Sequence, residues 1–83
     1  MNVQVQPNVT TAIKDYDRAI VDYSDAIKLN PNYVAACNYR AQVHSLKRDF
    51  RRAIADYDET ITLDLSNASA YSGRGSVYEA IGE

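Results

Sequence analysis

The chain has 83 residues, of which 46% are hydrophobic and 24% are charged, and its net charge is −2. This composition predicts one small globular domain, and the slight acidic excess disfavours a dedicated nucleic-acid binder, which is usually basic. The single cysteine, Cys37, excludes an intrachain disulfide, and with only one histidine present a metal cluster of cysteines and histidines is excluded too. We therefore expect no metal and no cofactor.

The N-terminal segment, residues 1–8, is predicted to be a flexible tail. It has neither the basic start nor the apolar run of a secretory signal peptide. No part of the chain approaches the roughly 18 consecutive apolar residues that a membrane-spanning helix requires. The sequence therefore favours a cytoplasmic protein with no membrane partner.

The first predicted helix covers residues 10–29, with Thr10 and Thr11 as alternative caps at its start. Its apolar and aromatic side chains recur at helical spacing, which places them on one stripe. This packing stripe comprises Ala19, Tyr23 and Ile27. Pro31 ends the segment, because its ring and its missing N–H cannot continue a helix.

The second and third predicted helices cover residues 33–47 and 50–63. Asn32 and Asp49 precede them and are the residue types that cap helix N-termini. The third helix repeats the packing stripe of the first, with Ala53, Tyr57 and Ile61.

The fourth predicted helix covers residues 68–81, with Ser66 or Asn67 as its cap. It contains Gly73 and Gly75, and each glycine costs about 1 kcal/mol relative to alanine inside a helix. The short connections around residues 48–49 and 64–67 force neighbouring helices to be antiparallel. The predicted fold is therefore all-α, with about four helices stacked as antiparallel hairpins.

Two segments of the chain are nearly the same decapeptide. Residues 18–27 read "RAIVDYSDAI", residues 52–61 read "RAIADYDETI", and six of the ten positions are identical. The offset of 34 residues between them also pairs Ala36 with Ala70 and Arg40 with Arg74. A fixed period of this size predicts stacked supersecondary units that bury their apolar faces against one another.

The period and the residue types together resemble the tetratricopeptide repeat family, whose unit is a helix–turn–helix of 34 residues. The resemblance covers about residues 15–83, and "NYRA" and "SGRG" are similar to the "NRG…AIxDY" variant of bacterial members. It implies the second helix of one repeat over 10–32, a complete repeat over 34–67 and the first helix of a further repeat over 68–83. The family's small and aromatic packing positions correspond to Ala41, Ala53, Tyr57, Gly75 and Tyr78. The chain departs from the family pattern at Cys37, His44 and Leu65, where an aromatic residue, a tyrosine and a proline are favoured.

The resemblance implies a non-catalytic protein-interaction module. In the family, the first helices of successive repeats line a groove that binds an extended peptide or a helix of a partner protein. By position, the groove side here comprises Ala35, Asn38, Gln42, Ser45, Ser69, Ser72, Ser76 and Glu79. A second hypothesis is a structural unit that forms homodimers or larger homo-oligomers through its open repeat faces. A nucleic-acid-binding helical repeat is the third hypothesis, and the net charge disfavours it.

Arg40 and Arg74 invite two interpretations. They could anchor an acidic ligand, or each could pair with an acid of the preceding helix. The second interpretation predicts the ion pairs Arg40–Asp22 and Arg74–Asp56, because both pairs repeat with the same period.

No group of residues predicts an enzyme. His44 has no serine or second carboxylate at a spacing that suggests a catalytic triad, and Cys37 lies at a position that is normally buried between repeats. The basic cluster "KRDFRR", residues 47–52, is either a phosphate-binding patch or a solvated edge of a turn, and it lacks the aromatic residues typical of a single-strand binder.

Overall fold

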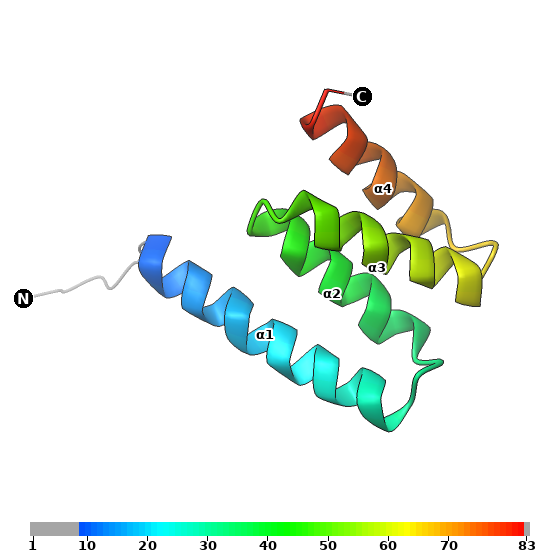
Figure 1. Ribbon diagram of the computed structural model, residues 1–83, viewed down its shortest axis with the longest axis horizontal. Helices are drawn as coiled ribbons and strands as arrows, with labels where there is room; N and C mark the ends of the chain where they lie inside the picture. The colour runs from blue at the N-terminus through cyan, green and yellow to red at the C-terminus, as the bar shows by residue number, and fades with distance from the viewer. Residues whose placement is uncertain (1–8, 83) are drawn as a thin grey trace, which may run out of the picture.

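The computed structural model describes residues 9–82 and contains four α-helices. They are α1 (Val9–Leu29), α2 (Val34–Leu46), α3 (Phe50–Leu63) and α4 (Ala68–Ala80). Consecutive helices reverse direction at short turns, as Figure 1 shows, and no strand occurs among the described residues. The predicted all-α stack of antiparallel hairpins is therefore confirmed. The tail predicted for residues 1–8 lies outside the described residues, as does residue 83.

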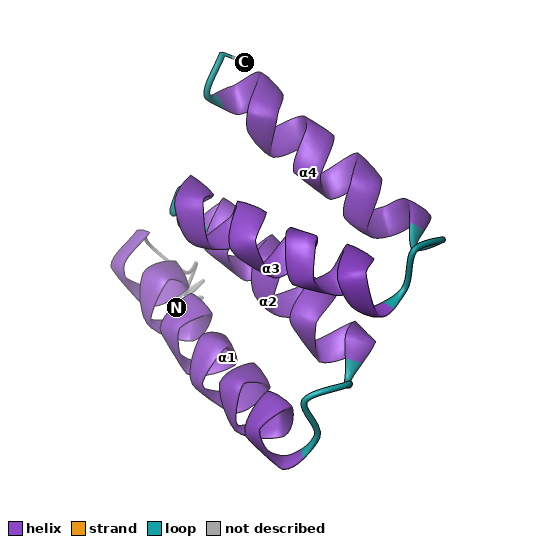
Figure 2. Ribbon diagram, turned by 45° about the vertical axis from the view of Figure 1, so that its right-hand side comes forward, coloured by secondary structure: helices purple, strands orange, loops and turns teal. Residues whose placement is uncertain are grey.

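The helices follow one another across a flat stack with principal extents of 52 × 35 × 18 Å. Helix α2 contacts α1, α3 and α4, whereas α1 contacts only α2 among the described helices. Figures 1 and 2 show α1 and α4 at opposite ends of this stack. None of the four helices is long and apolar enough to cross a membrane.

Two of the predicted helix caps form as expected. The Asp49 carboxylate accepts a hydrogen bond from the Arg52 backbone N–H at 3.3 Å, and the Asn67 side chain accepts one from the Ala70 N–H at 3.0 Å. These contacts satisfy N–H groups that the first turn of a helix leaves without partners. Of the two alternatives for α4, Asn67 is therefore the cap and Ser66 is not.

The predicted cap at Asn32 is wrong. The residue that precedes α2 is Tyr33, and its side chain makes no capping hydrogen bond. The Asn32 backbone N–H instead donates to Asn30 Oδ1 at 3.1 Å, inside the turn that follows α1.

The core lies where α2, α3 and α4 meet. It consists of the buried residues Ala41, Ala53, Tyr57, Ile61, Ala70 and Val77, with Phe50 and Ile54 packed against them. Ala41 and Ala53 have no exposed surface, so small residues of both α2 and α3 are fully enclosed in this core. From the first decapeptide, Ala19, Tyr23 and Ile27 are only half-buried, because α1 packs on a single neighbour.

The small residue that α4 presents to α3 is Gly73, whereas Gly75, the predicted packing position, faces open space among the described residues. A Cβ atom at Gly73 would lie 2.4 Å from Cζ of Tyr57, whereas a Cβ atom at Gly75 would meet nothing within 4 Å. Gly73 thus lets the Tyr57 ring lie directly against the α4 backbone. One period earlier, the counterparts are Tyr39 and Tyr23, whose ring centroids lie 5.7 Å apart.

Candidate functional site

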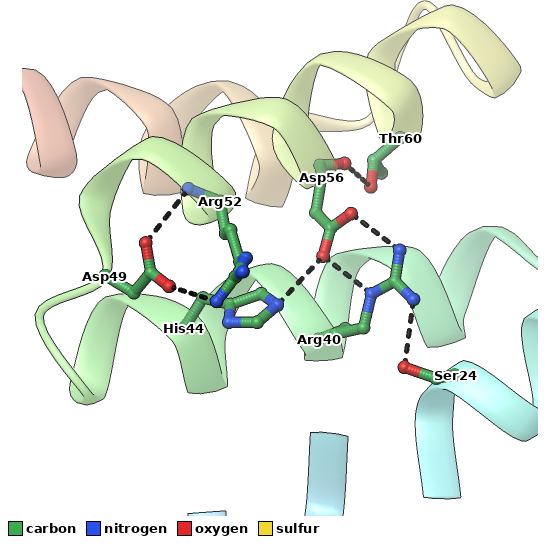
Figure 3. Close-up of polar contacts among 7 residues, drawn as sticks. All are labelled: Ser24, Arg40, His44, Asp49, Arg52, Asp56 and Thr60. Atoms are coloured by element: carbon green, nitrogen blue, oxygen red, sulfur yellow. Dashed lines mark hydrogen bonds and ion pairs between the residues drawn. The ribbon is translucent and has the colours of Figure 1, made fainter. Parts of the chain in front are cut away.

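The largest group of interacting polar side chains links α1, α2 and α3 (Figure 3). Asp56 on α3 is 8% exposed, and its carboxylate accepts hydrogen bonds from Arg40 Nε at 2.7 Å and from Arg40 Nη2 at 2.8 Å. The third contact of this guanidinium runs to α1, where Arg40 Nη1 donates to Ser24 Oγ at 3.0 Å. A bidentate arginine–carboxylate pair combines charge with fixed geometry, so Arg40 fastens three helices together.

The predicted ion pairs Arg40–Asp22 and Arg74–Asp56 are both wrong. Arg40 turns to Asp56 within its own hairpin, and the side chain of Asp22 is exposed. Arg74 binds Asp58 at 2.8 Å, and the Asp56 carboxylate is bound by Arg40. Both arginines still obey the period, because each reaches the residue sixteen places before it, Ser24 or Asp58.

His44 lies against the same carboxylate, with Nε2 at 3.6 Å from Asp56 Oδ2. Burial lowers the pKa of His44 below its ordinary value of 6.5, and the Asp56 carboxylate opposes that shift only in part. The imidazole is therefore neutral at neutral pH. His44 is 7% exposed and packs as a polar member of the core beside the Arg40–Asp56 pair.

Cys37 is buried, with 1% of its surface exposed. Burial, followed by the charge of Asp56, raises the pKa of its thiol. The thiolate is the nucleophilic form of cysteine, so a buried neutral thiol is inert. Residues 9–82 contain no group of histidine, cysteine and acidic side chains that could hold a metal ion, and their surface forms no pocket. The polar side chains of Figure 3 thus make structural contacts that connect the helices.

The basic cluster at residues 47–52 is largely engaged in contacts of its own. Lys47 forms an ion pair with Asp17 of α1, and Arg52 binds Asp49 at 3.0 Å. The Arg48 guanidinium lies over the Phe50 ring, 5.2 Å from its centroid. These contacts tie the α2–α3 turn to its surroundings, which favours the solvated-edge interpretation over a phosphate site.

Asn38, the residue at the centre of the predicted groove, is not available to a ligand. It is 7% exposed, and its Nδ2 donates to Ser69 Oγ at 3.1 Å. Its Oδ1 is buried and has no hydrogen-bond partner in the described structure. Asn38 therefore joins α2 to α4, and its prediction as a peptide-binding residue is corrected.

The other predicted groove residues remain at the surface of α2 and α4, and we call this surface the α2/α4 face. Gln42 and Ser45 on α2 are half-buried. The exposed members are Ala35, Ser69, Ser72, Ser76 and Glu79. The face is thus mainly polar, and only Glu79 on it is charged.

Two exposed residues of α2 were missed by the sequence analysis as members of this surface. Tyr39 is 48% exposed and Leu46 is 60% exposed. They share a helical stripe with Ala35 and Gln42, at spacings of three and four residues. Extending the stripe from Ala35 in steps of four and three would have found them. They add an apolar border to the polar α2/α4 face, and the Tyr39 ring on this border also packs against Tyr23 of α1.

No family model matches this chain, and a search of curated proteins finds no match either.

Proposed function

We propose that this chain is a non-catalytic protein-interaction module of the tetratricopeptide repeat kind. Its α2/α4 face would bind an extended peptide or a helix of a partner protein. The support begins with the 34-residue period, which makes α4 the counterpart of α2 at the level of individual residues. The buried and uncharged Cys37 suits a reducing, cytoplasmic setting.

The observation that carries this proposal is the direct contact between α2 and α4. The Asn38–Ser69 hydrogen bond holds the two helices side by side. The side chains of Gln42, Ser72 and Ser76 can then contact the same ligand. Amides and hydroxyls can both donate and accept hydrogen bonds, so they suit the backbone of an extended peptide. The exposed ring of Tyr39 offers apolar contact beside them, as is common at protein interfaces.

Nucleic-acid binding has less support. Most of the basic side chains of the 47–52 cluster already contact an acid or an aromatic ring, and the net charge is −2. A strong fall in nucleic-acid affinity with rising salt would favour that function instead.

The test is a peptide-array screen, with the best peptides measured by fluorescence anisotropy. The double variant Gln42→Arg/Ser76→Arg places two bulky charges on the α2/α4 face. We expect it to abolish binding. The matched control is Ala55→Arg/Thr62→Arg, which adds the same charge to exposed positions of α3. Equal loss of binding in the two variants would contradict the proposal, as would an array on which no peptide binds.

A further inference from the structure

Helices α1 and α4 are counterparts of the two helices of the intact α2–α3 hairpin. Shifted back by 34 residues, the bounds of α4 (Ala68–Ala80) coincide with those of α2 (Val34–Leu46). The same shift places α3 (Phe50–Leu63) within α1 (Val9–Leu29). The chain therefore holds one complete hairpin flanked by one helix of each type.

Helix α1 lacks the cover that α3 receives. On α3, Ala53, Asp56 and Thr60 are buried, and Asp56 is bound by Arg40 of the hairpin partner α2. Their counterparts on α1 are Ala19, Asp22 and Ala26, of which the alanines are half-buried and Asp22 is exposed. No described helix lies where an α2-like helix would cover this face.

Helix α4 lacks the cover that α2 receives. On α2, Cys37 and Ala41 are buried. Their counterparts on α4 are Tyr71 and Gly75, and both are exposed, Tyr71 by 44%. The space next to Gly75 is open, whereas Ala41 at the same position is fully covered. No described helix lies where an α3-like helix would cover α4.

The open faces of α1 and α4 carry opposite charges at equivalent positions. In the complete hairpin, the buried contact is Arg40 with Asp56. The counterpart of Arg40 is Arg74 on α4, and the counterpart of Asp56 is Asp22 on α1. Arg74 binds Asp58, and this contact is equivalent to the contact of Arg40 with Ser24. Among residues 9–82, no carboxylate makes the equivalent of the Asp56 contact with Arg74.

We propose that a second copy of this chain covers these faces, with α1 of one copy packed on α4 of the next. The new hairpin would reproduce α2–α3: Gly75 and Ala19 would take the places of the buried Ala41 and Ala53, and Arg74 would bind Asp22 of the second copy. Because the two faces differ, every copy keeps one open face after pairing. The contact is heterologous and extends into chains of copies rather than closing as a symmetric dimer. This inference does not depend on peptide binding at the α2/α4 face.

The first measurement is the molar mass of the 83-residue protein by sedimentation and light scattering over a wide concentration range. We expect the mass to rise with concentration and to pass that of a dimer. A mass that stays at one copy, or that stops at two, would overturn the proposal.

Charge reversal tests the geometry. The single variants Arg74→Glu and Asp22→Arg each place like charges in the new contact, and we expect each to weaken self-association by about tenfold or more. Mixing the two variants restores opposite charges at both kinds of junction, so association should return. The mixture also serves as the check on folding, since a misfolded variant could not restore association.

The matched controls are Arg51→Glu and Asp25→Arg, which make the same charge changes at exposed positions outside the new contact. They should leave the association unchanged. Failure of the mixture to associate while the wild type does, or equal weakening by the controls, would overturn the assignment of Arg74 to Asp22.

Discussion

The Arg40 guanidinium on α2 holds the Asp56 carboxylate on α3 through two hydrogen bonds of 2.7 and 2.8 Å. With its third contact to Ser24 on α1, this arginine connects three of the four helices. The pair lies at the edge of the core, where a carboxylate without its partner would be costly to bury. Loss of the Arg40 side chain would therefore leave the Asp56 carboxylate without its counter-charge.

Replacement of Arg40 by leucine should therefore destabilise the protein strongly. We expect a loss of about 2–4 kcal/mol in the free energy of unfolding, because Asp56 would stay buried without its cation. Urea denaturation followed by circular dichroism measures this loss. The matched variant Arg74→Leu breaks the more exposed contact with Asp58 and should cost clearly less. Similar losses for the two variants would contradict the structural role of Arg40.

The two glycines of α4 should respond in opposite directions to alanine. Gly73→Ala forces a Cβ atom against the Tyr57 ring, so we expect a loss of about 1–3 kcal/mol. Gly75→Ala meets open space and removes a helix-weakening glycine, so we expect a gain of up to about 1 kcal/mol. The measurement is the thermal unfolding midpoint of each variant and of the wild type at low protein concentration. A stabilising Gly73→Ala would show that the Tyr57 ring does not lie against α4.

His44 should make stability depend on pH. Burial holds its pKa in the folded protein below the ordinary value of 6.5, so the unfolded chain binds the proton more tightly. Its contribution is therefore constant above about pH 6.5 and is lost as the pH falls below that value. The charged groups facing it are Asp56, Asp49, Arg40 and Arg52.

The measurement is urea denaturation at several values between about pH 7.5 and 5, with His44→Gln as the control. The wild type should lose stability over this range, and the variant should lose less, since it has no imidazole to protonate. Parallel pH profiles for the two proteins would show that His44 is not the group responsible.

Cys37 should be unreactive in the folded protein. Its thiol is buried and its pKa is raised, so both access and thiolate formation are suppressed. We expect a thiol reagent to react more than about tenfold faster in denaturing urea than in buffer. Fast modification of the native protein would indicate that the packing around α2 opens readily.

Much of the fold could be predicted from local patterns in the sequence. The predicted ends of all four helices lie within one residue of those observed, because Pro31, the capping residues Asp49 and Asn67, and the packing stripes act over a few residues. The α2/α4 face was predicted less well. Asn38 and Tyr39 are adjacent in sequence but point about 100° apart around α2. The contact of α2 with α4 buries Asn38 and leaves Tyr39 exposed.

Spacing along the chain is enough to establish the helices, the 34-residue period and the residues that are equivalent across it. The packing of the helices selects which of two equivalent residues contacts a given partner. Asp22 and Asp56 hold the same place in the repeat, so periodicity cannot choose between them for Arg40, but the packing of α2 on α3 brings Asp56 within hydrogen-bonding distance. Likewise, Gly73 and Gly75 differ only in the direction they face, and the Tyr57 ring distinguishes them.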